Sequence, residues 1–302
     1  MDWLNGFDSR VDVDVPLSEH TWFGLGGTAA RMVSPRDEPQ LAALVQQAQA
    51  RGVPVRVLGS GANVLVSDAG VDGVVVRLNE PAFTTVSFDG EVATAGGGAD
   101  LMKLCSACVD RGLSGLECMA GIPGTVGGAI RMNAGGRFGE ISGCLEDARV
   151  MQPTGAVDVL ARDRIGFGYR RSNLGRAIVL SARFRLRRCR ADDVRARFRE
   201  YWRFKKASQP MAECSAGCIF KNPPGDSAGR LIDQAGLKGR TRGLARVSER
   251  HANFIVADDG ATATDVLELV DEIRSAVQEK FGILLDLEIE VWQPAAARSY
   301  AV

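Results

Sequence analysis

The stretch GIPGTVGGA, residues 121–129, decides the fold class of this 302-residue chain. Four glycines fall within its first eight residues, Pro123 fixes one backbone φ angle, and Thr125 offers a hydroxyl. Glycine reaches positive φ angles without strain and lets backbone N–H groups approach a phosphate closely. We therefore interpret the stretch as a structured nest for an anion and not as a flexible linker, and we expect a loop throughout residues 121–136.

A second glycine turn, GSGAN at residues 59–63, follows the predicted strand Val53–Leu58. By itself it is as compatible with a plain tight turn as with a ligand contact. Residues 121–129 lack the GxGxxG spacing of a Rossmann turn, an acidic residue about twenty positions further on, and the Lys-Ser/Thr ending of a triphosphate loop. Together the two turns predict a dinucleotide-binding fold of another class.

Around these turns, helix and strand signals alternate without a low-complexity linker or a fixed repeat, which favours an α+β fold. Helical spacing occurs at Leu41–Gly52, Asp100–Gly112, Asp192–Lys206, Ser227–Ala235 and Ala263–Phe281. Strands are expected at Val53–Leu58, Val64–Val66, Gly73–Leu78, Val92–Ala95, Ile178–Leu186, Ala252–Ala257 and Ile283–Trp292, with a hairpin of Ala148–Gln152 and Ala156–Ala161. The tail Pro294–Val302 is expected to be loose.

The charge balance is neutral, with 37 Lys and Arg against 37 Asp and Glu, so net charge points to neither nucleic acid nor an anionic membrane. The basic run Arg183–Arg190 stays open as a local anion site. The N-terminal residues have no basic region followed by an apolar core, and no apolar run approaches the roughly 18–20 residues of a membrane span. We expect a cytoplasmic protein without a nucleic-acid or membrane partner.

Seven cysteines are too few for a disulfide scaffold, and their odd number leaves at least one unpaired. Cys105 and Cys108 form a CxxC pair, but both lie on the apolar stripe of the predicted helix Asp100–Gly112. No second CxxC or nearby histidine completes a zinc set. We interpret the pair as core residues and expect no metal site.

Motifs along nearly the whole chain, in order, resemble the family of UDP-N-acetylenolpyruvoylglucosamine reductases, known as MurB. They are HTWFGLGGTAARMV (His20–Val33), VLGSGANVLVSD (Val57–Asp68), GLECMAGIPGTVGGAIRMNAGG (Gly115–Gly136), GYRRS (Gly168–Ser172), SAGCIFKNP (Ser215–Pro223), AGLKG (Ala235–Gly239), HANFIV (His251–Val256) and LEIEV (Leu287–Val291). The set is far more specific than either glycine turn. The direct step from Ser172 into Asn173–Gly175 favours the family's shorter class, which lacks an extra substrate-capping loop.

The resemblance implies a two-subdomain FAD-binding fold of the vanillyl-alcohol oxidase (PCMH) type, at residues 1–80 and 81–190, and a C-terminal α+β substrate domain at 191–302. It implies noncovalent FAD, NADPH as reductant, and reduction of UDP-N-acetylglucosamine enolpyruvate to UDP-N-acetylmuramate in peptidoglycan synthesis, a step of cell-wall biogenesis, cell shape and division. The expected partner is this small UDP-sugar, and the expected state a monomer or weak homo-oligomer. The cofactor-binding residues would be Gly59, Ser60, Gly61, Ala62, Asn63, Gly121, Ile122, Pro123, Gly124, Thr125, Gly127, Gly128, Asn133, Ala134 and Gly135.

Reducing an enol ether beside a carboxylate requires a hydride at the terminal vinyl carbon and a proton at the carbon next to the carboxylate. Negative charge collects on the carboxylate between the two steps, so a cation or strong donors must lie there. The resemblance assigns this role to Arg170, which follows Tyr169, a substrate-binding candidate. A planar guanidinium suits the charge because it bonds in two places. Arg171 is a rival by composition, and a surface arginine is the plainer interpretation.

Glu290 lies in the predicted strand Ile283–Trp292, where a period of two puts it on one face with Asp286 and Glu288. The resemblance makes Glu290 a catalytic aid, whereas a solvated strand face suffices for the other two. Trp292 stands where the family usually has a basic residue, which leaves Glu290 itself in place.

Cys218 departs from the family, whose proton donor at this position in SAGCIFKNP is usually a serine. A thiol can donate a proton as well, since its reference pKa is about 8.5 and it is mostly protonated at neutral pH. The alternative is a small buried hydrophobe in a protein with altered activity. We favour a working thiol because Arg170 and Glu290 are retained; Ser215 is a weaker substitute.

Lys221 and Asn222 match substrate-binding positions, although such a pair alone would be interpreted as a surface turn. Weaker candidates for diphosphate or NADPH contacts are Arg230, Lys238 and His251. Two rival functions remain: an FAD oxidase or dehydrogenase of the same fold, and a non-catalytic flavin or nucleotide-sugar binding protein in which Cys218 marks lost activity.

Overall fold

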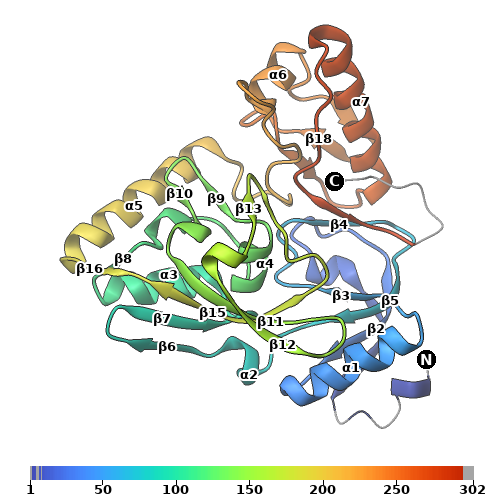
Figure 1. The fold of residues 1–302 in the computed structure, drawn as a ribbon. Coiled ribbons are helices and arrows are strands. Elements are labelled where there is room, and N and C mark those ends of the chain that lie inside the picture. The colour runs from blue at the N-terminus through green and yellow to red at the C-terminus, as the bar shows by residue number, and fades with distance from the viewer. Residues whose placement is uncertain (1, 5–6, 8, 295–302) are drawn as a thin grey trace. The chain divides into compact units, whose positions relative to one another are not determined.

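The computed structural model describes residues 2–4, 7 and 9–294, and the chain forms two compact units (Figure 1). Unit 1 takes residues 1–13, 31–59 and 73–205, and unit 2 takes residues 14–30, 60–72 and 206–302. The tail that the sequence marks as loose lies outside the described residues from position 295 onward. The division at residues 80 and 190 stays a prediction.

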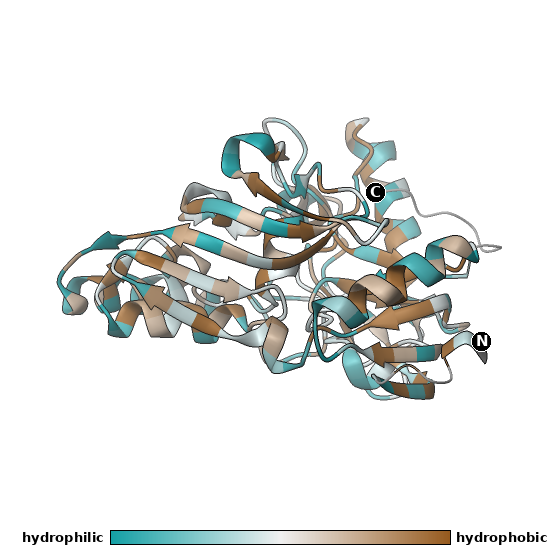
Figure 2. Cartoon of the chain, turned by 60° about the horizontal axis from the view of Figure 1, so that its bottom comes forward, coloured by the Kyte–Doolittle hydropathy of each residue, from teal (hydrophilic) through white to brown (hydrophobic). Residues whose placement is uncertain are grey.

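A five-stranded antiparallel sheet forms the centre of unit 1, in the order β12-β11-β15-β7-β6. Its strands are β6 (Val86–Asp89), β7 (Val92–Gly96), β11 (Leu145–Met151), β12 (Val157–Ala161) and β15 (Ile178–Arg185). The predicted hairpin is confirmed, because β11 and β12 pair up to Met151 and Val157 at the turn. Figure 2 shows hydrophobic and hydrophilic residues alternating along the strands, as half-buried sheets require.

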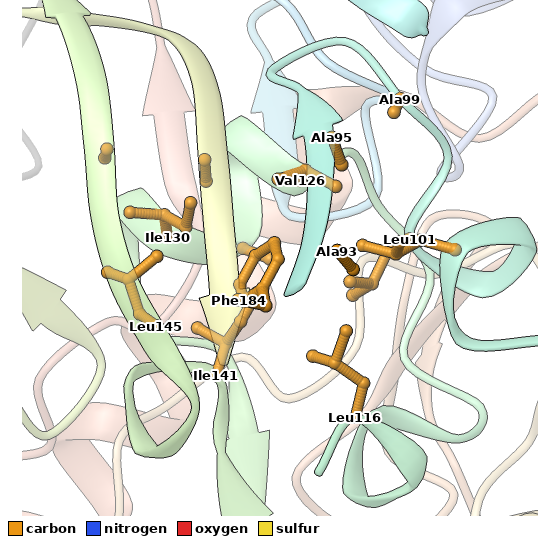
Figure 3. Close-up of a cluster of buried hydrophobic side chains, with 14 of the residues drawn as sticks. Ala93, Ala95, Ala99, Leu101, Leu116, Val126, Ile130, Ile141, Leu145 and Phe184 are labelled. Carbon is orange, nitrogen blue, oxygen red and sulfur yellow. The ribbon is translucent and has the colours of Figure 1, made fainter. Parts of the chain in front are cut away.

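One face of this sheet packs on the main core of unit 1, which Figure 3 shows around Phe184, Val126 and Leu101. The helices α3 (Leu101–Asp110) and α4 (Val126–Arg131) contribute to this core. Asp100 begins α3 by accepting a hydrogen bond from the Lys103 N–H at 2.8 Å. Cys105 and Cys108 are fully buried there, which confirms their interpretation as core residues.

A second core of unit 1 lies under helix α1 (Glu38–Ala50), which buries Leu41, Leu44 and Val45. Parallel strands β3 (Val55–Val57) and β5 (Val71–Val76) belong to a four-stranded sheet with β1 (Arg10–Pro16) and β2 (Thr28–Ser34), in the order β1-β2-β5-β3. The predicted helix and strands are therefore present here, with ends shifted by one to three residues.

Unit 2 pairs β4 (Val64–Val66) in parallel with β20 (Glu290–Trp292), and forms a three-stranded sheet of β17 (Thr241–Arg242), β18 (Ala245–Val247) and β19 (Ile255–Ala257). Helix α6 (Ala228–Gln234) and helix α7 (Ala263–Phe281) complete its core. Helix α7 matches its predicted bounds because Thr262 and Asp265 form a capping box and Gly282 ends it at a φ of 69°.

The predicted strand Ile283–Trp292 is wrong in extent, since only Glu290–Trp292 is strand. The backbone before Glu290 hydrogen-bonds instead to a loop, with Glu288 N donating to Ile219 O at 2.8 Å. Its apolar residues are nevertheless buried, with Leu287 and Ile289 at 0% exposure.

The remaining elements are short or lie at the edges of the units. They are η1 (Asp2–Leu4), η2 (Leu17–His20), α2 (Pro81–Thr84), β8 (Leu113–Ser114), η3 (Glu117–Met119), β9 (Gly135–Gly136), β10 (Gly139–Glu140), η4 (Ile141–Gly143), η5 (Arg162–Arg164), β13 (Phe167–Gly168), β14 (Arg171–Ser172), β16 (Arg187–Arg188) and α5 (Ala191–Ser208).

Candidate functional site

The glycine stretch at residues 121–129 is held against the turn that follows β7. Leu101 N donates to Gly124 O at 3.0 Å, and Gly127 N donates to Gly97 O at 2.7 Å. The sequence predicts a loop throughout residues 121–136, but α4 begins at Val126. The Thr125 hydroxyl caps that helix by accepting from Gly128 N at 3.3 Å. The stretch is thus a fixed turn into a short helix.

Two reasons for glycine can be distinguished in this stretch and in the turn at residues 59–63. A Cβ on Gly127 would lie 2.9 Å from Gly97 O, and one on Gly59 would lie 2.7 Å from the Thr125 Oγ1. These positions need glycine for packing within the protein. Gly124 has a φ of 148° and nothing within 4 Å of its Cβ position, so its backbone faces open space. Gly124 is accordingly a position where a ligand can approach the chain.

Two buried polar atoms in the predicted cofactor set lack partners within the described part of the chain: Ser60 Oγ and Asn133 Oδ1. Asn133 is 1% exposed, and its Nδ2 donates to Glu140 Oε2 at 2.8 Å and to Gly168 O at 3.1 Å. An unpaired buried polar group costs about 1–3 kcal/mol. Each atom, Ser60 Oγ in unit 2 and Asn133 Oδ1 in unit 1, is therefore available for a hydrogen bond to a ligand.

Arg170 occupies a two-residue turn with Tyr169 between β13 and β14. Its φ is +54°, a left-handed conformation that costs a non-glycine residue about 1–2 kcal/mol and is concentrated at functional sites. Its Nη2 donates to Gly135 O at 2.9 Å, and its guanidinium carbon lies 5.0 Å from the Tyr169 ring centroid. The strained backbone thus aims this guanidinium at the predicted cofactor residues, whereas the side chain of Arg171 packs beside Gly168.

The loop that carries Cys218 pairs with the segment before β20. Lys221 N donates to Asp286 O at 2.8 Å, and Phe220 bridges Leu287 in antiparallel fashion. Because antiparallel segments run in opposite directions, Cys218 and Glu290 leave the paired region at the same end. Cys218 is half-buried and Glu290 is exposed.

The turn at residues 59–63 is tied to the same segment. Glu290 N donates to Asn63 O at 2.9 Å, and Asn63 Nδ2 donates to Glu288 O at 3.0 Å. This connection gathers a predicted cofactor residue and two predicted catalytic residues, Cys218 and Glu290, within unit 2. The predicted residues therefore form one group around Arg170 in unit 1 and another around Glu290 in unit 2.

The predicted substrate residues Lys221 and Asn222 differ in their contacts. Lys221 is half-buried, and its ammonium has no hydrogen bond or ion pair within the described residues. Asn222 Oδ1 accepts from Ala228 N at 3.0 Å, at the start of α6. Lys221 is thus available to an anion, while part of the Asn222 amide stabilises the fold.

The weaker candidates have partners within the protein. Arg230 pairs with Asp226, and Lys238 Nζ lies 2.9 Å from Asp233 Oδ2. Burial lowers the pKa of His251, whose Nδ1 accepts from Asn253 N at 3.3 Å. These contacts explain the three side chains without a ligand.

The basic run Arg183–Arg190 is also partly neutralised. Arg183 Nε lies 2.9 Å from Asp147 Oδ2, and Arg185 Nη2 lies 2.9 Å from Glu146 Oε2. These two arginines therefore form ion pairs on the face of the sheet that points away from the core. Sequence reasoning missed Asn253, which is buried and contacts the Cys218 loop; it stands inside HANFIV, the one available signal.

In the described part of the chain, no group of three or more His, Cys, Asp or Glu is placed to hold a metal ion. No helix there is both long and apolar enough to span a membrane.

Comparison with known proteins adds family evidence. Residues 29–160 match the FAD binding domain model, and residues 209–292 match the C-terminal domain of UDP-N-acetylenolpyruvoylglucosamine reductase. The chain is 43% identical over 285 residues to UDP-N-acetylenolpyruvoylglucosamine reductase 2 of Symbiobacterium thermophilum, covering 94% of this chain and 92% of that one. It is 40% identical over 289 residues to the reductase of Paramagnetospirillum magneticum, covering 95% and 94%.

The crystal structure of the reductase (MurB) from Thermus caldophilus superposes with a TM-score of 0.82 at 42% identity, covering 94% of this chain and 100% of that one. Fold and matches together define an FAD-binding oxidoreductase of the α+β class, which confirms the predicted fold. The chain belongs to the UDP-N-acetylenolpyruvoylglucosamine reductase family.

Proposed function

We propose that this chain reduces UDP-N-acetylglucosamine enolpyruvate to UDP-N-acetylmuramate, with noncovalent FAD as cofactor and NADPH as reductant. One observation carries the proposal: 43% identity with a named reductase over 94% of the chain. Bound FAD would take a hydride from NADPH and supply it to the substrate. The residues that would hold FAD are the glycine turns at 59–63 and 121–128 together with 133–135.

The unpartnered oxygens of Ser60 and Asn133 support this cofactor assignment. Both lie in segments that the resemblance assigns to FAD, Ser60 in the turn at residues 59–63 and Asn133 in residues 133–135. Residues 1–80 and 81–190 would form the two cofactor subdomains, and residues 191–302 the substrate domain. This division extends the matched ranges 29–160 and 209–292.

Arg170 would bind the substrate carboxylate, where negative charge develops during reduction. Its guanidinium is held by Gly135 O and the Tyr169 ring, so little reorganisation is needed when the charge appears. Tyr169 is 44% exposed and can contact substrate as well. Lys221 would contribute a second cation, and Asn222 would contact the substrate beside it.

Cys218 would deliver the proton to the carbon beside the carboxylate. A thiol is mostly protonated at neutral pH and can donate when correctly placed. Glu290, which leaves the paired segment at the same end as Cys218, would polarise the reacting group or assist proton delivery. In this proposal a cysteine takes the role of the serine that the family usually has at this position.

The proposed setting is the cytoplasm, with the UDP-sugar as partner and the protein as a monomer or weak homo-oligomer. NADPH and substrate would bind in turn at the same face of the cofactor, which gives ping-pong kinetics. The rival oxidase would consume oxygen rapidly or carry a covalent flavin. A pure binding protein would be yellow and would not oxidise NADPH.

A steady-state assay of NADPH oxidation, with and without the enolpyruvyl sugar, tests the proposal. We expect sugar-dependent oxidation with parallel lines in double-reciprocal plots. An equal rate of NADPH oxidation with and without the sugar would support the oxidase. Intersecting lines in the double-reciprocal plots would refute the ping-pong order.

A further inference from the structure

Asn253 holds the backbone that immediately follows Cys218. It is 2% exposed and lies just before β19. Its Oδ1 accepts from Phe220 N at 2.9 Å, and its Nδ2 donates to Phe220 O at 2.7 Å. Its own carbonyl accepts from Ile219 N at 2.8 Å. One residue therefore fixes three consecutive peptide groups, beginning with the one that joins Cys218 to Ile219.

Only a primary amide suits this arrangement. Phe220 presents both its backbone N–H and its backbone C=O to one side chain, which must therefore accept one hydrogen bond and donate another. A carboxylate would accept but not donate, and it would face the Phe220 carbonyl with a negative charge. Since the site is buried, each lost bond leaves a polar group unpaired.

The opposite side of the same loop is also fixed. Glu288 N donates to Ile219 O, and Lys221 N donates to Asp286 O, both at 2.8 Å. Ile219 and Phe220 are themselves buried at 0% and 1% exposure. The chain after Cys218 thus has no room to shift unless one of these contacts is lost.

We infer that Asn253 is a positioning residue that places the Cys218 thiol for protonation of the substrate. This role rests on the proposed function, because it presupposes that Cys218 is the proton donor. Asn253 touches the backbone next to Cys218, so it acts on the reaction through the position of the thiol. Misplacement of a reacting group by about 1 Å can cost about 100-fold in rate.

The main test variant is Asn253→Asp, which keeps the size of the side chain; Asn253→Ser is a second variant should the first fold poorly. Two half-reactions are followed by anaerobic stopped-flow: bleaching of the flavin by NADPH, and product formation from the reduced enzyme on addition of the enolpyruvyl sugar. We expect bleaching within about two-fold of wild type and product formation slowed by about 10–100-fold.

Ser248→Ala provides the matched control. Ser248 is 1% exposed on the same segment, and its hydroxyl accepts from Arg250 N at 3.2 Å. This substitution removes a partly buried hydrogen bond without touching the Cys218 loop. Both half-reactions of the control should match wild type.

A double variant separates positioning from general damage. If Asn253 acts through the thiol, Asn253→Asp should add less than about three-fold to the loss already caused by Cys218→Ala. An equal loss in both backgrounds, an equal loss in both half-reactions, or no loss would overturn the inference. Failure of the wild-type enzyme to form product would instead refute the proposed function.

Discussion

Glu117→Gln should destabilise unit 1 at the short helix η3, which precedes the glycine stretch at residues 121–129. Glu117 is 7% exposed. One carboxylate oxygen accepts from Ser114 Oγ at 2.7 Å and Arg197 Nε at 3.0 Å, and the other accepts from Gly115 N at 2.6 Å. Burial alone would raise the pKa of Glu117, but these hydrogen bonds hold it below its usual value.

The expected loss follows from these three contacts. A hydrogen bond to a charged group contributes about 1.5–3 kcal/mol, and glutamine keeps one acceptor while its amide N–H₂ meets a donor. We expect a loss of about 2–3 kcal/mol in the free energy of unfolding at neutral pH. At about 2–4 °C per kcal/mol, the midpoint of thermal unfolding should fall by about 4–12 °C.

The effect should depend on pH with a definite sign. Because the folded-state pKa of Glu117 is lowered, its contribution is present above the unfolded value of about 4.3 and is lost as pH falls through the folded pKa. The gap between wild type and variant should therefore narrow below about pH 4. Denaturant unfolding from pH 7 downward measures this gap.

Glu91→Gln is the matched control, because Glu91 is exposed and its carboxylate accepts only from Arg188 N, at 2.9 Å, among the described residues. It should change stability by less than about 1 kcal/mol. A Glu117→Gln variant as stable as this control, or a gap that widens toward acid, would refute the reasoning.

Three further predictions concern the candidate site. Cys218→Ser should keep substantial turnover, whereas Cys218→Ala should lower it by about 10²–10⁴-fold and leave flavin reduction by NADPH intact; normal turnover of the alanine variant would contradict the donor assignment. Arg170→Lys should lower kcat by about 10²–10³-fold at unchanged FAD content, measured by steady-state kinetics and the visible spectrum. Ser60→Ala should weaken FAD binding about five- to tenfold in fluorescence titration without lowering the unfolding midpoint of the FAD-free protein, because its Oγ has no partner among the described residues.

The sequence predicted elements well where local signals agree. Helix α7 begins at a capping box and ends at a left-handed glycine, both of which are local, so its predicted bounds match. The Met151–Val157 hairpin likewise follows from its Pro-Thr-Gly turn. The helix α4 was missed because two of its six residues are glycines, which disfavour helix, and its core packing of Val126 and Ile130 is not visible in sequence.

The candidate site can be predicted only in part from the sequence, because its strained backbone and the hydrogen bonds that hold its loops depend on residues far apart in the chain. The motif singled out Arg170, but its left-handed backbone and its bond to Gly135 arise from the hairpin around it. Asn253 gives no signal of its own, since an amide that closes on Phe220 looks like any polar residue before a strand. The predicted strand ending at Trp292 is longer than the observed one, because the residues before Glu290 hydrogen-bond to the loop that carries Cys218 and not to a strand.

A single-turnover experiment tests the central claim most directly. The enzyme is reduced by NADPH without oxygen, freed of excess NADPH, and mixed with the enolpyruvyl sugar while the visible spectrum and the product mass are recorded. The account predicts return of the oxidised flavin spectrum with one product per flavin, heavier than the sugar by two hydrogens. A flavin that stays reduced, or one that is reoxidised without this product, would contradict it.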